Sequence, residues 1–119
     1  MTKISNKQQL KKDMLLIYGL VCWGDELWIP DGKNIITMHH ITPVRSKGRL
    51  TWDNIALLSL YFHDFFNRIE QVDQKLADEL NQLFRELNRS MKPPGEQHYS
   101  DVVFLTDKAE YKHGIEMKR

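Results

Sequence analysis

The stretch that decides the fold runs from residue 38 to residue 63 and reads MHHITPVRSKGRLTWDNIALLSLYFH. It begins with two adjacent histidines, His39 and His40, near the end of a β-prone segment over residues 35–41. A loop with a proline and a glycine follows, and the apolar residues after Asn54 lead into a helix that holds His63. This content of imidazoles and an amide predicts a metal-assisted phosphodiesterase centre.

The histidines suit two different roles in such a centre. A divalent cation assists cleavage because it stabilises charge on the phosphate oxygens and on the leaving 3′ oxygen. Imidazole binds metals in its neutral form, which is the majority form at pH 7 because the reference pKa is about 6.5. Side chains alternate across a strand, so His39 and His40 should point to different sides. We therefore expect His39 and His63 to hold the cation and His40 to activate water.

Asn54 is the candidate orienting residue of this centre. A general base needs its second nitrogen held by a nearby amide or carbonyl. Asn54 could meet that need by bonding either His40 or the loop backbone that positions it. The alternative is a simple cap or turn residue, because Asn is common in loops.

This pattern resembles that of the HNH endonuclease family, which has the ββα-metal (His-Me finger) fold. The family pattern is an Asp/His-His pair that ends a strand, Ile and Pro just after it, a glycine-containing loop, Asn-Leu-x-Leu-Leu and a helical His. This chain has HHITP at residues 39–43, Gly48, NIALL at residues 54–58, and His63 at the family spacing from Asn54. The resemblance covers about residues 14–70. It implies that His39 and His63 are metal ligands, His40 is the general base and Asn54 is the orienting residue.

Two further groups of residues lie beside this pattern. Asn67 follows His63 by four residues on the same helical face, and in some relatives such a position supports the metal or the phosphate. It is otherwise an ordinary helix-surface residue. The basic residues Arg45, Lys47 and Arg49 follow the histidine pair and are candidate contacts to DNA phosphates. Their alternative reading is an ordinary solvated loop.

The chain departs from the family at the positions of a structural zinc site. Many members carry two Cys-x-x-Cys pairs, and the corresponding residues here are Cys22, Asp25, Ser59 and Phe62. With one thiol among four positions, no structural zinc is expected. We expect aromatic packing to stiffen this part of the chain instead. The aromatic residues concerned are Trp23, Trp28, Trp52, Phe62, Phe65 and Phe66.

The sequence predicts an α+β fold of one domain over residues 1–119. The ββα-metal core occupies about residues 14–70, preceded by a helix over residues 6–20 with Ser5 as a possible N-cap and Gly19 as its stop. Short strands are expected over residues 20–41. The extension, residues 71–119, should contain an amphipathic helix from Val72 to Met91 and a short strand over residues 101–106. His98 and His113 lie outside the motif and are expected on the surface.

The composition of the chain limits how the protein could bind DNA and in which cellular compartment we expect it. A net charge of +1 over 119 residues argues against a polybasic binding tail but leaves room for a local basic patch. No apolar run reaches the roughly 18 residues of a membrane span, and no secretory signal is recognisable at the N-terminus. A single cysteine fits a reducing cytoplasm.

We therefore expect a metal-dependent HNH endonuclease that nicks or cuts DNA with one divalent cation, Mn²⁺, Co²⁺, Ni²⁺ or Mg²⁺. Every candidate catalytic position holds a competent residue type. Because a monomer carries one centre, double-strand cutting would need two encounters or a homodimer. The alternative is a catalytically silent HNH-fold module that binds nucleic acid or protein. A hydrolase of another substrate fits less well, since nothing reads as a small-molecule pocket.

Overall fold

The computed structural model describes residues 6–32 and 35–117, so the proposed N-cap, Ser5, lies outside the described residues. It has a mixed α+β fold, which confirms the predicted class. No helix in the described ranges is long and apolar enough to cross a membrane. The elements are α1 (Asn6–Tyr18), β1 (Ile36–His40), the 3₁₀ turns η1 (Val44–Ser46) and η2 (Trp52–Asn54), β2 (Ile55–Ser59), α2 (Leu60–Val72), α3 (Gln74–Ser90) and α4 (Glu96–His113).

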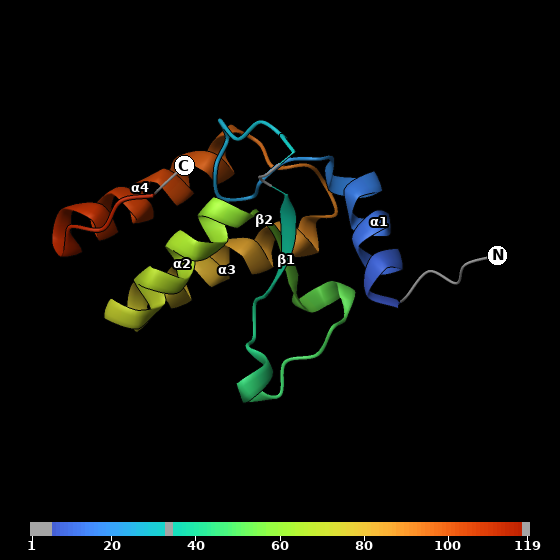
Figure 1. Ribbon diagram of the computed structural model, residues 1–119, viewed down its shortest axis with the longest axis horizontal. Helices are drawn as coiled ribbons and strands as arrows, with labels where there is room; N and C mark the ends of the chain where they lie inside the picture. The colour runs from blue at the N-terminus through green and yellow to red at the C-terminus, as the bar shows by residue number, and fades with distance from the viewer. Residues whose placement is uncertain (1–5, 33–34, 118–119) are drawn as a thin grey trace.

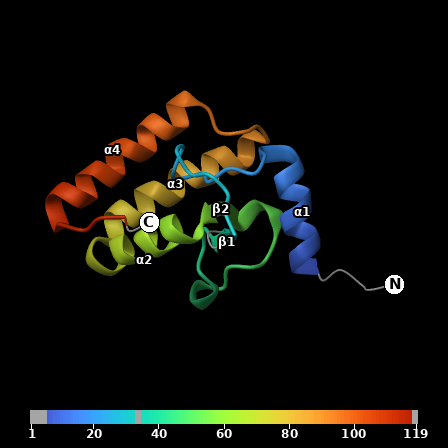
Figure 2. The same ribbon diagram turned by 45° about the horizontal axis from the view of Figure 1, so that its top comes forward.

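The β hairpin occupies the centre of the molecule. β1 and β2 pair antiparallel, with Ile36 opposite Ser59 and His40 opposite Ile55. Both views place α1 on one side of the hairpin and α2 on the other, while α3 runs across the hairpin and its end reaches α1, where Tyr18 donates to the carbonyl of Asn88 (Figures 1 and 2). Every residue of β2 is buried, as expected for a strand that is covered on both faces. β1, β2 and α2 thus form the ββα core that the sequence predicts.

The junctions between the helices are set by polar caps. The side chain of Ser59 accepts a hydrogen bond from the Phe62 amide and begins α2. Asp73 separates α2 from α3 and caps α3 by accepting from the Leu76 amide at 3.1 Å. The predicted helix from Val72 to Met91 is therefore shorter than expected, because Val72 closes α2. Met91 has a left-handed φ of 55° just after α3, and both of these residues are exposed.

Two predicted strand regions are wrong. Residues 101–106 lie inside α4, where burial of Val102, Leu105 and Ala109 follows helical spacing. Residues 20–32 form turns, and no strand occurs among the described residues between α1 and β1. In both regions apolar residues with strand propensity find no partner strand, because the hairpin is already enclosed by helices. Tertiary packing therefore overrides local preference.

α4 holds the turn that follows α1. The Tyr99 hydroxyl donates to the carbonyl of Cys22 at 2.8 Å, and His98 Nε2 donates to the carbonyl of Trp23 at 2.6 Å. Burial lowers the pKa of His98, so its ring is neutral at pH 7. His113 also has a partner, since its Nε2 lies 2.8 Å from Asp73 Oδ2. Both histidines are half-buried, so their predicted surface placement is wrong.

The four positions that correspond to the family's zinc ligands do come together. Cys22 Sγ accepts from the amides of Ser59 at 3.2 Å and Gly24 at 3.4 Å. The ring of Phe62 lies so close to Gly24 that a Cβ there would overlap it. One thiol, a hydroxyl that caps a helix and a phenyl ring do not fit a tetrahedral zinc. Hydrogen bonds from backbone amides to the sulfur and the aromatic contact hold this region together in place of such a metal.

Candidate active site

His39 lies in a buried position between the hairpin and two helices. Its ring centroid is 4.5 Å from that of Phe66 on α2 and 6.1 Å from that of Phe84 on α3. The residue is 6% exposed. Its Nε2 is 2.8 Å from Oδ1 of Asn81, which also belongs to α3. A strand, two aromatic rings and an amide together determine the orientation of this imidazole.

His63 lies on α2 and faces the same part of β1. Its ring centroid is 5.2 Å from that of His39. Nδ1 of His63 is 2.8 Å from the hydroxyl oxygen of Thr37, and that hydroxyl lies 2.8 Å from the carbonyl of Leu58. A carbonyl only accepts hydrogen bonds, so the single Thr37 proton goes to Leu58 and His63 Nδ1 donates to Thr37. Nε2 of His63 therefore keeps its lone pair.

Burial keeps both imidazoles neutral. It lowers the pKa of His39 to about 4, against the opposing effect of the hydrogen bond to Asn81. Burial also lowers the pKa of His63, and the nearby His40 adds to that effect. Both rings are consequently in the form that binds metals at pH 7.

The separation of the two rings is compatible with a shared divalent cation. Two imidazoles that share one cation at about 2 Å from each nitrogen have ring centres roughly 5 Å apart. The observed separation is 5.2 Å. Each ring uses one nitrogen in its hydrogen bond, and no partner is found for the other nitrogen within the described residues. In that part of the chain, no three His, Cys, Asp or Glu side chains are arranged so that together they could hold one metal ion. Further ligands would come from substrate, water or amide oxygens.

His40 lies at the end of β1, half-buried and next to these rings. A charge on His40 would lower the pKa of both His39 and His63. Strand alternation turns His40 away from the Phe66 side. Among the described residues, its ring has no hydrogen-bond partner. His40 is therefore placed differently from the other two histidines.

Asn54 bonds the loop backbone, which is one of its two expected arrangements. Its Oδ1 accepts from the Thr42 amide at 2.7 Å. Its Nδ2 donates to the carbonyls of Thr42 and Arg49, each at 3.0 Å. The backbone carbonyl of Asn54 also accepts from the Ile41 amide at 2.8 Å. The buried Asn54 thus ties the residues after the histidine pair to the far end of the same loop.

Residues 21–61 match the HNH endonuclease family. This segment is similar to an HNH domain. The match spans about a third of the chain, includes His39, His40 and Asn54, and ends two residues before His63. The family is one of nucleases, so a nuclease or nucleic-acid-binding function follows for this chain at that coarse level. Comparisons with curated proteins and with solved structures give no significant match.

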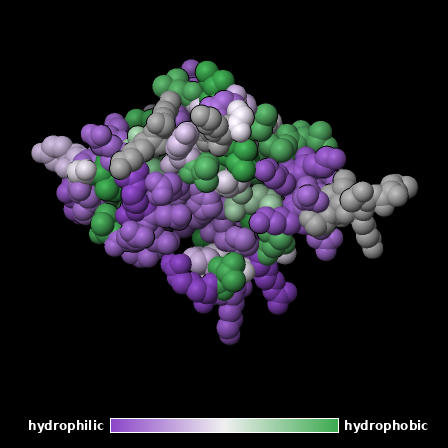
Figure 3. Space-filling model, viewed as in Figure 1, coloured by the Kyte–Doolittle hydropathy of each residue, from purple (hydrophilic) through white to green (hydrophobic). Residues whose placement is uncertain are grey.

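The loop between β1 and β2 presents its basic residues in two ways. Arg45 turns back to α2, where its Nη2 is 3.4 Å from Oε1 of Glu70. Lys47 and Arg49 are exposed and line a hollow on the other side of the loop. Gly48 permits this tight turn, because a Cβ there would overlap the carbonyl oxygen of Thr42. Figure 3 shows hydrophilic side chains projecting from the end of the molecule where this loop lies in Figure 1.

Sequence reasoning missed two polar residues of α3 that reach the ββα core. Arg85 lies beside the basic loop, with Nη2 at 3.4 Å from Thr42 Oγ1, and it lines the same hollow as Lys47 and Arg49. Asn81 bonds His39 from the buried face of the helix. The sequence offers one sign of the role of Asn81, because this amide lies between Leu80 and Phe84 in an otherwise apolar helical stripe. Asn67, which was considered as support for the metal, is exposed one turn beyond His63.

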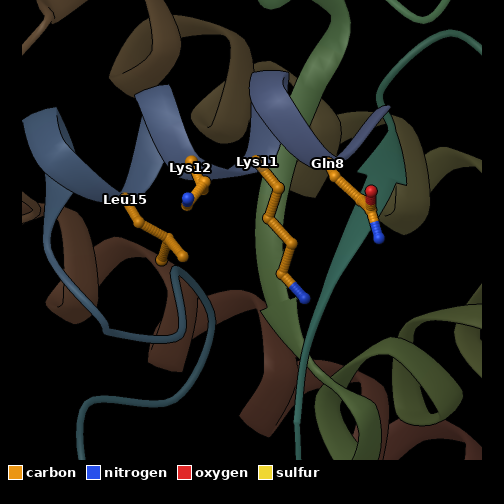
Figure 4. A pocket seen from close by; sticks show the side chains of 4 residues that line it. All are labelled: Gln8, Lys11, Lys12 and Leu15. Atoms are coloured by element: carbon orange, nitrogen blue, oxygen red, sulfur yellow. The ribbon is translucent and has the colours of Figure 1, made fainter. Parts of the chain in front are cut away.

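A separate hollow of about 370 Å³ lies beside α1, away from the candidate site. It is lined by Gln8, Lys11, Lys12 and Leu15, and Figure 4 shows that these side chains all come from the one helix. None of them belongs to the HNH pattern. The described residues that line this hollow supply ammonium groups but no histidine or carboxylate that could act as a general base.

Proposed function

We propose that this protein is a divalent-metal-dependent endonuclease that hydrolyses DNA phosphodiester bonds. The observation that carries the proposal is the 5.2 Å separation of the His39 and His63 rings, beside His40 at the end of β1, where the chain matches the HNH family. Two of these rings, buried His39 and half-buried His63, are neutral at pH 7 and can bind a cation. The third ring, that of His40, lies at the end of β1 and is suited to activating water.

Each residue has a distinct part in the proposed reaction. His39 and His63 hold the cation through their neutral rings. Bound there, a divalent cation supplies charge stabilisation at the phosphate and at the leaving 3′ oxygen. His40 accepts a proton from the attacking water on a free ring nitrogen. Asn54 keeps the loop after His40 in place through its three hydrogen bonds to the backbone.

The proposed DNA contact is the basic surface formed by Lys47, Arg49 and Arg85. These three cations line one open hollow beside the loop, together with a single carboxylate, Asp53. Phosphate contacts position a protein on DNA without reading its sequence. Arg45 is engaged by Glu70, but its side chain is largely exposed and can still meet the backbone of bound DNA.

Plasmid nicking tests the proposed activity. The protein should convert supercoiled plasmid to the nicked form when a divalent cation is added, and a chelator should stop the reaction. The competing function is a silent HNH-fold binding module, which the 6% exposure of His39 favours, because a core histidine is buried in the same way. DNA binding without any nicking across the metals tested would establish that alternative.

Metal preference gives the first prediction. Two imidazole ligands make a softer site than one that contains a carboxylate, and Mg²⁺ prefers oxygen ligands and retains its waters. Cleavage with Mn²⁺, Co²⁺ or Ni²⁺ should therefore be faster than with Mg²⁺ at equal concentration. Initial nicking rates in each metal provide the measurement. Strong activity in Mg²⁺ alone would contradict ligation by His39 and His63 without a carboxylate.

Arg85 gives the second prediction. Replacing Arg85 with Gln should weaken DNA binding and reduce the slope of log affinity against log salt by roughly one, because one phosphate contact is lost. Fluorescence anisotropy with a labelled duplex at several salt concentrations measures both quantities. The matched control is Lys75→Gln, which removes an exposed charge from α3 away from the loop. Equal losses for the two variants would show that only net charge matters.

A further inference from the structure

The chain itself supplies a hydrogen-bond partner for His39 from outside the HNH match. Asn81 lies on α3, twenty residues beyond the end of the matched segment. Its side chain is buried, and its Oδ1 lies 2.8 Å from His39 Nε2. A buried amide on the apolar face of a helix has a desolvation cost unless it bonds a partner. This amide finds that partner in the first histidine of the pair.

The chemistry of this contact determines which nitrogen of His39 carries the proton. A neutral imidazole has one N–H and one nitrogen with a lone pair. An amide oxygen accepts hydrogen bonds and cannot donate them, so Nε2 of His39 must carry the proton. Nδ1 then keeps the lone pair that a cation needs. Thr37 has the same effect on His63, whose free nitrogen is Nε2.

We propose that Asn81 is a positioning residue that holds His39 in the Nε2-protonated tautomer and thereby directs Nδ1 to the cation. The role rests on the proposed function, because it concerns the same metal site. Packing against Phe66 and Phe84 restrains the ring, and the amide selects between its two tautomers. Such outer partners orient metal ligands and raise their affinity.

The tautomer is measured directly on the metal-free wild-type protein. Long-range ¹H–¹⁵N NMR correlations of the histidine side chains distinguish a protonated Nε2 from a protonated Nδ1. The signals of His39 are assigned by comparison with a His39→Gln variant. We expect the Nε2-protonated form for His39 at neutral pH. A ring protonated at Nδ1, or an even mixture of the two forms, would overturn the proposal.

Variants of Asn81 connect the tautomer to metal affinity. Asn81→Leu keeps the branched shape of the side chain but removes the acceptor, and Mn²⁺ affinity by titration calorimetry should fall about 10–100-fold. Asn81→Asp keeps an acceptor and should retain affinity near the wild-type value. The control is Asn88→Leu, which removes another buried amide from the same helix, one that donates to the carbonyls of Trp52 and Ile55. That variant should lose stability but bind Mn²⁺ as the wild type does.

The outcomes separate this role from the proposed function. Titrations are made at a temperature where circular dichroism shows every variant to be folded. If Asn81→Leu binds Mn²⁺ as tightly as the wild type while the wild type nicks DNA, the positioning role is wrong and the nuclease assignment stands. If the wild type binds no Mn²⁺, the proposed function and the cation-directing role both fail. An equal loss of affinity in Asn81→Leu and Asn88→Leu would also reject a specific role for Asn81.

Discussion

Replacing His40 with alanine is expected to lower the rate of DNA cleavage by about 10²–10⁴-fold, the usual cost of removing a general base. The fold should survive. His40 is half-buried at the end of β1, and its ring bonds no other group among the described residues, so its removal leaves no buried partner unsatisfied. Mn²⁺ affinity should be nearly unchanged, because the proposed ligands are His39 and His63.

Single-turnover cleavage and Mn²⁺ titration of the same preparation measure these two effects. The contrasting variant is His39→Ala, which should lose metal affinity together with activity. If the His40→Ala variant cleaves within a few-fold of the wild type, the base is another group. If it instead loses metal binding, His40 is a ligand and the roles of the two adjacent histidines must be exchanged.

Replacing Trp23 with alanine is expected to reduce the free energy of unfolding by about 3–5 kcal/mol. Trp23 is 0% exposed, and its ring centroid is 4.7 Å from that of Tyr18. Its backbone also links the turn to the hairpin through a 2.8 Å hydrogen bond to Leu57. The control is Trp28→Ala, which should cost less, because Trp28 is only partly buried against the core.

Chemical denaturation monitored by circular dichroism measures the free energy of unfolding of both tryptophan variants. A separate experiment adds a strong chelator to the wild-type protein and follows both cleavage and thermal unfolding. Chelation should stop cleavage without unfolding the chain, because packing and hydrogen bonds hold the region around Cys22. Removal of the proposed catalytic cation should change the melting temperature only as loss of a native-state ligand does. Collapse of the melt on chelation would instead reveal a structural metal, since such metals contribute folding energy.

The histidine pattern was readable from the sequence because its parts are local. β1, the loop, β2 and α2 occupy one continuous stretch, and short loops place their side chains near each other. The fixed sequence spacings between His39, Asn54 and His63 therefore predict that the two histidine rings lie close together. For Asn54 the sequence left only two hydrogen-bond partners open, the ring of His40 and the backbone of the adjacent loop.

The extension beyond residue 70 was less readable because its contacts are distant along the chain. The run over residues 101–106 has strand propensity, but whether it becomes strand or helix depends on its packing partner, and here α4 packs on α3. His98 bonds a carbonyl that lies 75 residues earlier, and no local signal marks such a contact. Its partner became visible only when the tertiary structure brought α4 to the turn after α1.

The sequence alone determined the HNH core and the three histidines, since their residue types and spacings act within one supersecondary unit. The tertiary structure decided what surrounds them. Packing of α3 against α2 brings Asn81 to His39 and Arg85 to the basic loop. The physical reason is that a helical stripe shows which face is buried but not which residues that face will meet. Partner identity arises only when the elements pack together.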